Sequence, residues 1–210
     1  MTDATNPRLQ MYLAARDAEA GDIAADRRVP LETLADWITG KIRSGKPADV
    51  VFICTHNSRR SHMAQIWAQV AAAWYGVDGV TTYSGGTEAT AFNPRAVAAL
   101  TTAGLEIDVV EPGDNPVYEV RYTATRPPIR AFSKVYSDPP NPTEGYCAVM
   151  TCSEADEACP VVVGADVRIA VLYVDPKVSD GTERETATYD ERCGQIAREM
   201  LYVMSRVAGR

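Results

Sequence analysis

Two consecutive strand–loop–helix units are the feature that most constrains how this chain folds. The first begins with the β-branched run Val50–Ile53 and continues into a helical stripe of apolar residues over 63–74. The second runs from a strand at 80–83, through a predicted loop at Ser84-Gly85-Gly86, to a helix opened by Asn93-Pro94, where Asn is a favoured N-cap and Pro a favoured first residue. Successive units of this kind predict a parallel sheet.

Two later segments extend this sheet. Residues 148–150 form a strand that leads to Cys152, and residues 169–172 form another that leads to Asp175. Because parallel strands present their carboxyl ends at one edge, we expect Cys54, Cys152 and Asp175 to share a crevice.

Three further segments lie outside this alternation. Residues 1–46 are predicted to form an N-terminal helical extension, preceding a domain over 47–210 that closes with a helix. Residues 111–142 hold seven of the 13 prolines and two alternating stretches, at 117–122 and 129–136, which indicate a hairpin-like insertion.

Composition excludes several classes of function. The 210 residues carry a net charge of −7, which argues against a nucleic acid or an anionic membrane surface as the partner. No apolar run approaches the roughly 20 residues of a membrane span, and the N-terminus lacks a signal-peptide pattern, so we expect a cytoplasmic protein with no membrane partner. Five cysteines are then expected to be reduced thiols, and with only two histidines no metal site is predicted.

The loop that follows the first strand carries the strongest chemical pattern. Between a strand and a helix, its backbone N–H groups and the helix N-terminus can converge on a tetrahedral oxyanion and favour the Cys54 thiolate. Arg60 can hold two oxygens of such an anion in a bidentate fork. The candidate oxyanion-binding residues are Thr55, His56, Asn57, Ser58, Arg59, Arg60 and Ser61. A lone cysteine would more often be a buried strand-end residue, but the Cys-x5-Arg-Ser spacing favours a nucleophile.

The pattern Cys54 to Ser61 resembles the signature of the low-molecular-weight protein tyrosine phosphatases and of the thioredoxin-coupled arsenate reductases that share their fold. The resemblance continues through Tyr83-Ser84-Gly85-Gly86 and Asn93-Pro94. It implies a flavodoxin-like, doubly wound α/β fold with a four-stranded parallel sheet, of the phosphotyrosine protein phosphatase I-like type, carrying N-terminal helices and a hairpin-like insertion. It also implies that Asn57 and Ser84 support the loop.

The remaining cysteines separate the two activities. Cys152 and Cys159, with six residues between them, resemble the second and third redox cysteines of the reductases. The implied relay passes from Cys54 to Cys152 to Cys159 and ends in a disulfide that an external thiol reductant such as thioredoxin removes. Because seven residues of helix rise about 10 Å and bridged Cα atoms lie within about 7 Å, we expect residues 152–159 to unwind on oxidation. Their alternative interpretation is a pair of small buried residues.

Asp175-Pro176 resembles the general acid of the family, although a turn before proline would also place an aspartate there. The following segment, Lys177 to Glu183, resembles the corresponding segment of the reductases. It lacks the aromatic residues with which phosphatases hold a phosphotyrosine ring. Asp175 is therefore expected to protonate the departing oxygen.

Several positions depart from the family. His56 stands where glycine is usual and is expected to alter the loop backbone, and Arg59 either adds charge to the site or is solvated. Gln65 replaces a glutamate linked to a cation site in some reductases, so potassium dependence is not expected. Cys147 and Cys193 match no motif and are interpreted as structural.

Three hypotheses follow. The first is an arsenate reductase acting through Cys54, Arg60, Asp175, Cys152 and Cys159, with no bound cofactor. The second is a phosphatase acting on phosphotyrosine or a small phosphomonoester, and the third a non-catalytic oxyanion-binding protein. The expected partners are a small oxyanion and a thioredoxin-like reductant, and the chain is expected to be a monomer or a dimer.

Overall fold

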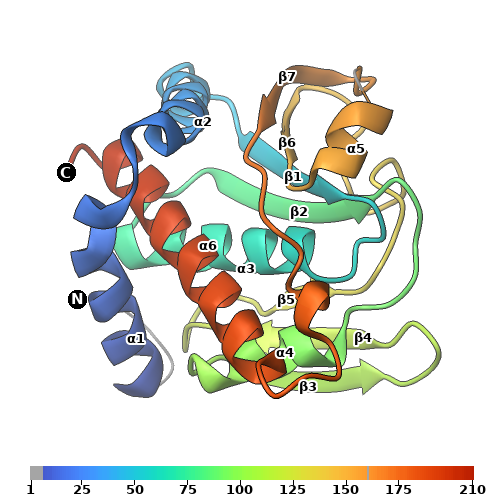
Figure 1. Ribbon diagram of the computed structural model, residues 1–210. Coiled ribbons are helices and arrows are strands. Elements are labelled where there is room, and N and C mark those ends of the chain that lie inside the picture. Colours follow the sequence, from blue (N-terminus) through green and yellow to red (C-terminus); the bar gives the residue numbers. More distant parts are fainter. Residues whose placement is uncertain (1–6, 160) are drawn as a thin grey trace.

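The computed structural model describes residues 7–159 and 161–210. Its centre is a four-stranded, fully parallel sheet in the order β2-β1-β6-β7 (Figure 1). The strands are β1 (Ala48–Cys54), β2 (Val80–Gly86), β6 (Tyr146–Met150) and β7 (Ala165–Ala170). The chain first steps from β1 outward to β2 and later returns to β6 on the other side of β1, so the strand order reverses beside β1. In open α/β sheets that point binds ligands.

Helices cover both faces of this sheet, as the predicted flavodoxin-like, doubly wound fold requires (Figure 1). Side chains alternate along β1: Val50 and Phe52 enter the larger core with the long helices, whereas Val51 and Ile53 enter a smaller core with α5. Burial on both faces explains why the strand reads as a continuous β-branched run rather than as an alternating one. The helices are α1 (Pro7–Ala18), α2 (Ala25–Arg43), α3 (Arg60–Tyr75), α4 (Pro94–Thr102), α5 (Ser153–Ala158) and α6 (Glu185–Val207), with two 3₁₀ helices, η1 (Glu19–Asp22) and η2 (Pro176–Ser179).

The N-terminal helices α1 and α2 pack against α6 and end before β1 begins. The larger core thereby gains fully buried side chains from them, including Leu9, Leu13, Leu31 and Ile38. No helix in the described ranges is long and apolar enough to cross a membrane.

The insertion forms a separate three-stranded antiparallel sheet, β3-β4-β5. Its strands are β3 (Glu106–Glu111), β4 (Val117–Arg121) and β5 (Ile129–Ala131). The predicted antiparallel pairing of the two alternating stretches is present as β4 with β5, and β3 adds a third strand on the other side of β4, so the sheet begins at Glu106, ahead of the boundary predicted at 111. The predicted strand over 129–136 is a strand for three residues only, because residues 132–136 turn away to contact β2 and the loop after β1.

Two strand boundaries also differ from the sequence prediction. The predicted loop Ser84-Gly85-Gly86 is wrong: these residues continue β2 and pair with Phe52, Ile53 and Cys54. A Cβ on Gly85 would lie 2.3 Å from the Cα of Tyr136, so glycine is needed there for the insertion to approach the strand. The last strand, predicted at 169–172, lies earlier, at Ala165–Ala170.

Candidate active site

The nucleophile loop, residues 54–61, joins the end of β1 to the start of α3 at the reversal of strand order. Cys54 ends β1 and is 4% exposed. Its Sγ lies 3.1 Å from Ser61 Oγ on the first turn of α3. The thiol therefore faces the N-terminal end of a 16-residue helix, where the helix dipole and free N–H groups stabilise negative charge.

Asn57 holds the loop in shape. Its Nδ2 donates to Ser61 Oγ at 2.9 Å and lies 3.2 Å from His62 Nδ1, while its Oδ1 accepts from the Lys134 backbone N–H at 3.0 Å. Because that N–H requires an acceptor, the amide orientation is fixed, and the two Nδ2 protons point toward Ser61 Oγ and His62 Nδ1. Ser61 Oγ accepts one of them, so its own proton is free to point at Cys54 Sγ.

Backbone conformation agrees with this role for Asn57. It is the non-glycine residue with a positive φ, +43°, within the described ranges, and asparagine tolerates the left-handed region better than most residues. His56, expected to alter the loop, therefore lies outside the left-handed region. The His56 side chain turns outward to pair with Glu88 at 2.8 Å, while its carbonyl accepts hydrogen bonds from Thr90 Oγ1 and Ser133 Oγ.

The two loop arginines have different surroundings. The Arg60 guanidinium is buried, donating to the Tyr173 carbonyl at 3.1 Å and to Asp175 Oδ2 at 2.8 Å. Arg59 is not a solvated residue: its Nε donates to Tyr189 Oη at 2.8 Å, and that hydroxyl donates to Asp180 Oδ1 at 2.9 Å. Burial raises the pKa of Tyr189 to about 12, so the phenol stays protonated.

Asp175 lies within reach of the loop, as the carboxyl-end rule predicts. Its Oδ1 accepts from the Lys177 backbone N–H at 3.0 Å, which caps η2, and its Oδ2 contacts Arg60. Capping of η2 needs only Oδ1. The bond between Oδ2 and Arg60 is an additional contact that associates Asp175 with the oxyanion loop.

Cys152 approaches the loop from the neighbouring strand. Its Sγ lies 3.5 Å from Thr55 Oγ1 and accepts the N–H of Ala155 at 3.4 Å, which makes it the N-cap of α5. Burial raises the pKa of Cys152, and the Thr55 hydroxyl and the Ala155 N–H partly offset that effect. The thiol is thus stored protonated beside groups that can stabilise its thiolate.

Cys159 lies at the opposite end of α5, as the residue following its last turn. Arg168 on β7 binds this end, since it donates to the carbonyls of Cys159 and Asp156 and pairs with the Asp156 carboxylate. Cys152 and Cys159 therefore cap the two ends of one intact helical segment, and all five cysteines are free thiols.

The other predicted residues vary in their contact with the site. Ser58 Oγ donates to the Ala91 carbonyl and anchors the middle of the loop. Ser84 is fully buried in β2, but its hydroxyl has no hydrogen-bond partner within the described residues, so its predicted support of the loop has no hydrogen bond behind it. Cys147 and Cys193 are buried, and burial raises the pKa of each, that of Cys193 to about 12.

Sequence reasoning missed the supports that come from distant segments. Ser133 and Lys134 of the insertion bond to His56 and Asn57, and Tyr189 of α6 binds Arg59. The available signal was a pair of consecutive polar residues, Ser133-Lys134, which interrupts the alternation of the stretch 129–136. No group of three or more potential metal ligands gathers within the part of the chain that the structure describes.

With its strand-end thiol and arginine-bearing oxyanion loop at the switch point of a flavodoxin-like sheet, the chain is similar to the low-molecular-weight phosphatase superfamily. A family model described as "Low molecular weight phosphotyrosine protein phosphatase" matches residues 49–114. The crystal structure of the low-molecular-weight protein tyrosine phosphatase from T. tengcongensis superposes with a TM-score of 0.51 at 15% identity, covering 76% of this chain and 99% of that one.

Curated proteins similar to this chain include arsenate reductases. The arsenate reductase of Bacillus licheniformis is 27% identical over 148 residues, which span 68% of this chain and 84% of that protein. That of Bacillus subtilis is 29% identical over 143 residues, with the same two coverages. An arsenate reductase of Staphylococcus aureus is 41% identical over 58 residues, covering 28% of this chain and 41% of that protein.

Proposed function

We propose that this protein is an arsenate reductase that works through a relay of Cys54, Cys152 and Cys159. The observation that carries the proposal is the contact between Thr55 in the nucleophile loop and Cys152, which brings a second thiol to the loop. A phosphatase needs the first thiol but has no use for the second. The similarity to arsenate reductases supports the same conclusion.

The first step is attack of the Cys54 thiolate on arsenic(V). The loop N–H groups and Arg60 bind the arsenate oxygens, and a Cys54 S–As bond forms as an As–O bond breaks. Asp175, next to Arg60, gives its proton to the departing oxygen, which leaves as water. For this the Arg60 guanidinium must exchange its bond to the Asp175 carboxylate for bonds to the anion.

The second step transfers electrons to arsenic. Cys152 attacks Cys54 Sγ, the S–S bond forms, and the S–As bond breaks with its electron pair remaining on arsenic, which leaves as arsenite, As(III). Cys159 then attacks Cys152 Sγ and releases the Cys54 thiolate, leaving a Cys152–Cys159 disulfide. A dithiol such as reduced thioredoxin reduces this disulfide to two thiols and is itself oxidised to a disulfide.

The helix between the two cysteines sets the requirement for the last exchange. Cys152 and Cys159 cap the two ends of α5, and an intact helical segment separates their Cα atoms by about 10 Å, farther than a disulfide allows. Oxidation therefore requires α5 to unwind and Arg168 to release the Cys159 end. A six-residue helix is short enough to unwind at low cost, because isolated helices of this length are marginal.

The test compares arsenate-dependent NADPH oxidation, coupled through thioredoxin and thioredoxin reductase, with hydrolysis of an aryl phosphate. Cys54→Ser should abolish arsenate turnover, and Cys152→Ser and Cys159→Ser should each stop it after at most one turnover. Cys147→Ala, which alters a buried thiol outside the site, should retain it. Full arsenate turnover in Cys152→Ser would refute the relay.

The same assay tests the phosphatase alternative, which the family model supports. Aryl phosphate hydrolysis that depends on Cys54 but not on Cys152 or Cys159, without arsenate turnover, would establish a hydrolase. Binding of phosphate by Cys54→Ser, with neither reaction in the wild type, would establish a non-catalytic oxyanion-binding protein.

A further inference from the structure

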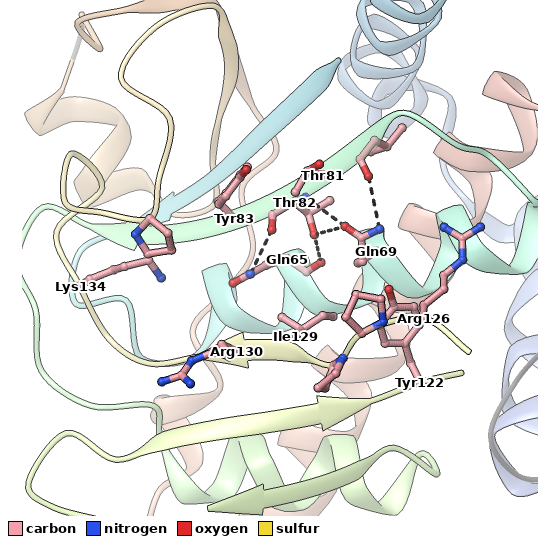
Figure 2. Close-up of a pocket in the computed structure, with 14 residues that line it drawn as sticks. Gln65, Gln69, Thr81, Thr82, Tyr83, Tyr122, Arg126, Ile129, Arg130 and Lys134 are labelled. Atoms are coloured by element: carbon pink, nitrogen blue, oxygen red, sulfur yellow. Dashed lines mark hydrogen bonds between the residues drawn. The ribbon is translucent and has the colours of Figure 1, made fainter. Parts of the chain in front are cut away.

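A groove of about 470 Å³ lies between the edge of the central sheet and the insertion, outside the nucleophile loop (Figure 2). One wall is formed by β2 and α3 and the other by the segment from Tyr122 to Lys134. This volume falls in the range of small-molecule sites. Apolar side chains line much of it, notably Val80, Tyr122, Pro127, Pro128, Ile129 and Pro140.

The exposed edge of β2 does not offer its backbone to a ligand in this groove. Gln69 Nε2 donates to the Val80 carbonyl and its Oε1 accepts from the Thr82 N–H, while Gln65 Nε2 donates to the Thr82 carbonyl (Figure 2). Two glutamines of α3 thus take the place of a neighbouring strand, so an added peptide strand is not the occupant. A ligand in the groove is therefore bound by side chains rather than by the backbone of β2.

Those side chains give the groove a positive charge within an acidic protein. Arg126, Arg130 and Lys134 line it, and no Asp or Glu is among its described lining residues. Arg126 and Arg130 each pair through one Nη2 with an exposed carboxylate. The charge of the groove therefore favours an anion.

Lys134 is the least compensated of these cations. It is 5% exposed, and its Nζ makes no ion pair within the described residues; it donates to the Phe132 carbonyl at 3.4 Å and lies 4.5 Å from the centre of the Phe132 ring. A buried ammonium with one long hydrogen bond gains strongly from an anionic partner, because charge-assisted hydrogen bonds are strengthened where water is excluded.

Gln65 supplies a second unsatisfied group. It is 4% exposed, and its Oε1 has no hydrogen-bond partner among the described residues. Figure 2 shows the Gln65 amide and the Lys134 side chain directed toward one another from opposite walls. A ligand that donates to Gln65 Oε1 and accepts from Lys134 Nζ would satisfy both buried groups.

We propose that this groove is a second ligand site, for a small organic carboxylate whose apolar body also carries a hydroxyl donor. The carboxylate binds Lys134, the hydroxyl donates to Gln65 Oε1, and the apolar body lies against Ile129 and the neighbouring prolines. This site does not depend on the reaction proposed for Cys54.

The site is connected to the nucleophile loop through the main chain. The Lys134 backbone N–H bonds to Asn57 Oδ1, and Asn57 in turn holds Ser61, whose hydroxyl contacts Cys54. A ligand that fixes the Lys134 side chain therefore acts on the same residue whose backbone N–H makes the hydrogen bond that orients the loop. We expect occupancy to change the reactivity of Cys54.

The test measures binding of 3-hydroxybenzoate by calorimetry at neutral pH. Benzoate lacks the hydroxyl and 3-hydroxybenzyl alcohol lacks the charge, and each should bind more weakly, the neutral alcohol by about tenfold or more. Equal binding of 3-hydroxybenzoate and the alcohol, or no binding of 3-hydroxybenzoate, would overturn the proposal.

Three variants locate the bound acid. Lys134→Met removes the charge, and Ile129→Asp places a negative charge on the apolar wall of the groove; both should lose about tenfold or more in affinity. Lys46→Met, an exposed lysine away from the groove, should bind like the wild type. Thermal unfolding checks that each variant is folded, and wild-type affinity in both groove variants would place the acid elsewhere and refute the site.

The connection to the loop has its own measurement. The rate at which iodoacetamide alkylates Cys54, identified by peptide mass, should change at least about twofold on saturation with 3-hydroxybenzoate in the wild type and not in Ile129→Asp. An unchanged rate in the saturated wild type would refute the effect on Cys54.

Discussion

Lys134 keeps its ammonium group where little water reaches it, and Lys134→Met measures what that burial costs. Burial lowers the pKa of Lys134 from 10.5 to about 8, an effect that the charge of Asp138 only partly opposes. The unfolded chain therefore holds this proton more tightly than the folded chain does. The cost to stability is complete below pH 8 and disappears as the pH rises past 10.5.

The size of the effect follows from the two pKa values. At about 1.36 kcal/mol per pKa unit, burial of the charged lysine costs about 3 kcal/mol at pH 7 and under about 1 kcal/mol at pH 10. Methionine fills similar space without charge but gives up the Lys134 contacts with the Phe132 carbonyl and ring. We therefore expect Lys134→Met to be more stable than the wild type by about 2 kcal/mol at pH 7, and this advantage to fall by about 2.5 kcal/mol by pH 10.

Urea unfolding at pH 7, 8, 9 and 10 is the assay, with Lys46→Met as the matched control. Ionisation of tyrosines at high pH affects all three proteins alike, so the difference between variants isolates the lysine. Lys46 is exposed, and its replacement should change stability little at any pH. A stability difference between Lys134→Met and the wild type that does not vary with pH would refute this reasoning.

Further predictions concern the loop and the redox helix. Asn57→Ala should lower the free energy of unfolding by about 2–3 kcal/mol, because it removes the side-chain hydrogen bonds and disfavours the positive φ. It should also slow alkylation of Cys54. Asn57→Gly, which accepts the positive φ, should recover part of the stability but not the alkylation rate. Gly86→Ala should be strongly destabilising in urea, because its Cβ would lie 2.6 Å from a carbonyl oxygen of the nucleophile loop; near-wild-type stability would show that the loop can move aside. Arg168→Met should free the end of α5 and raise the alkylation rate of Cys159 several-fold, and an unchanged rate would show that the clamp does not limit access.

Local patterns predicted the elements that position the nucleophile. The apolar runs of β1 and α3, and the Asn93 cap of α4, depend on neighbouring residues, and the structure confirms each of them. Ser84-Gly85-Gly86 misled the prediction because glycine and serine are turn residues, whereas here glycine admits the backbone of Tyr136. β3 was not predicted, because it is almost wholly exposed and so lacks a period-two apolar pattern.

For the site, the topology rule succeeded where distance along the chain would have failed. The carboxyl ends of parallel strands bring Cys152 and Asp175 to the nucleophile loop, as predicted. The supports from Ser133, Lys134 and Tyr189 could not be predicted, because they depend on how the insertion and α6 dock onto the sheet. Tertiary contacts of this kind do not produce a periodic pattern of apolar residues in the sequence.

The hydrogen bond from the Lys134 N–H to Asn57 joins residues 77 positions apart in the chain. This separation determines when the nucleophile loop can take its final shape during synthesis. At about 5–20 residues per second, a ribosome needs roughly 4–15 seconds to proceed from Asn57 to Lys134. Throughout that interval the cysteine exists while the partner that shapes its loop does not. Long-range closure of this sort also slows folding, so a newly made chain gains the hydrogen bond that shapes its nucleophile loop only after the insertion has been synthesised.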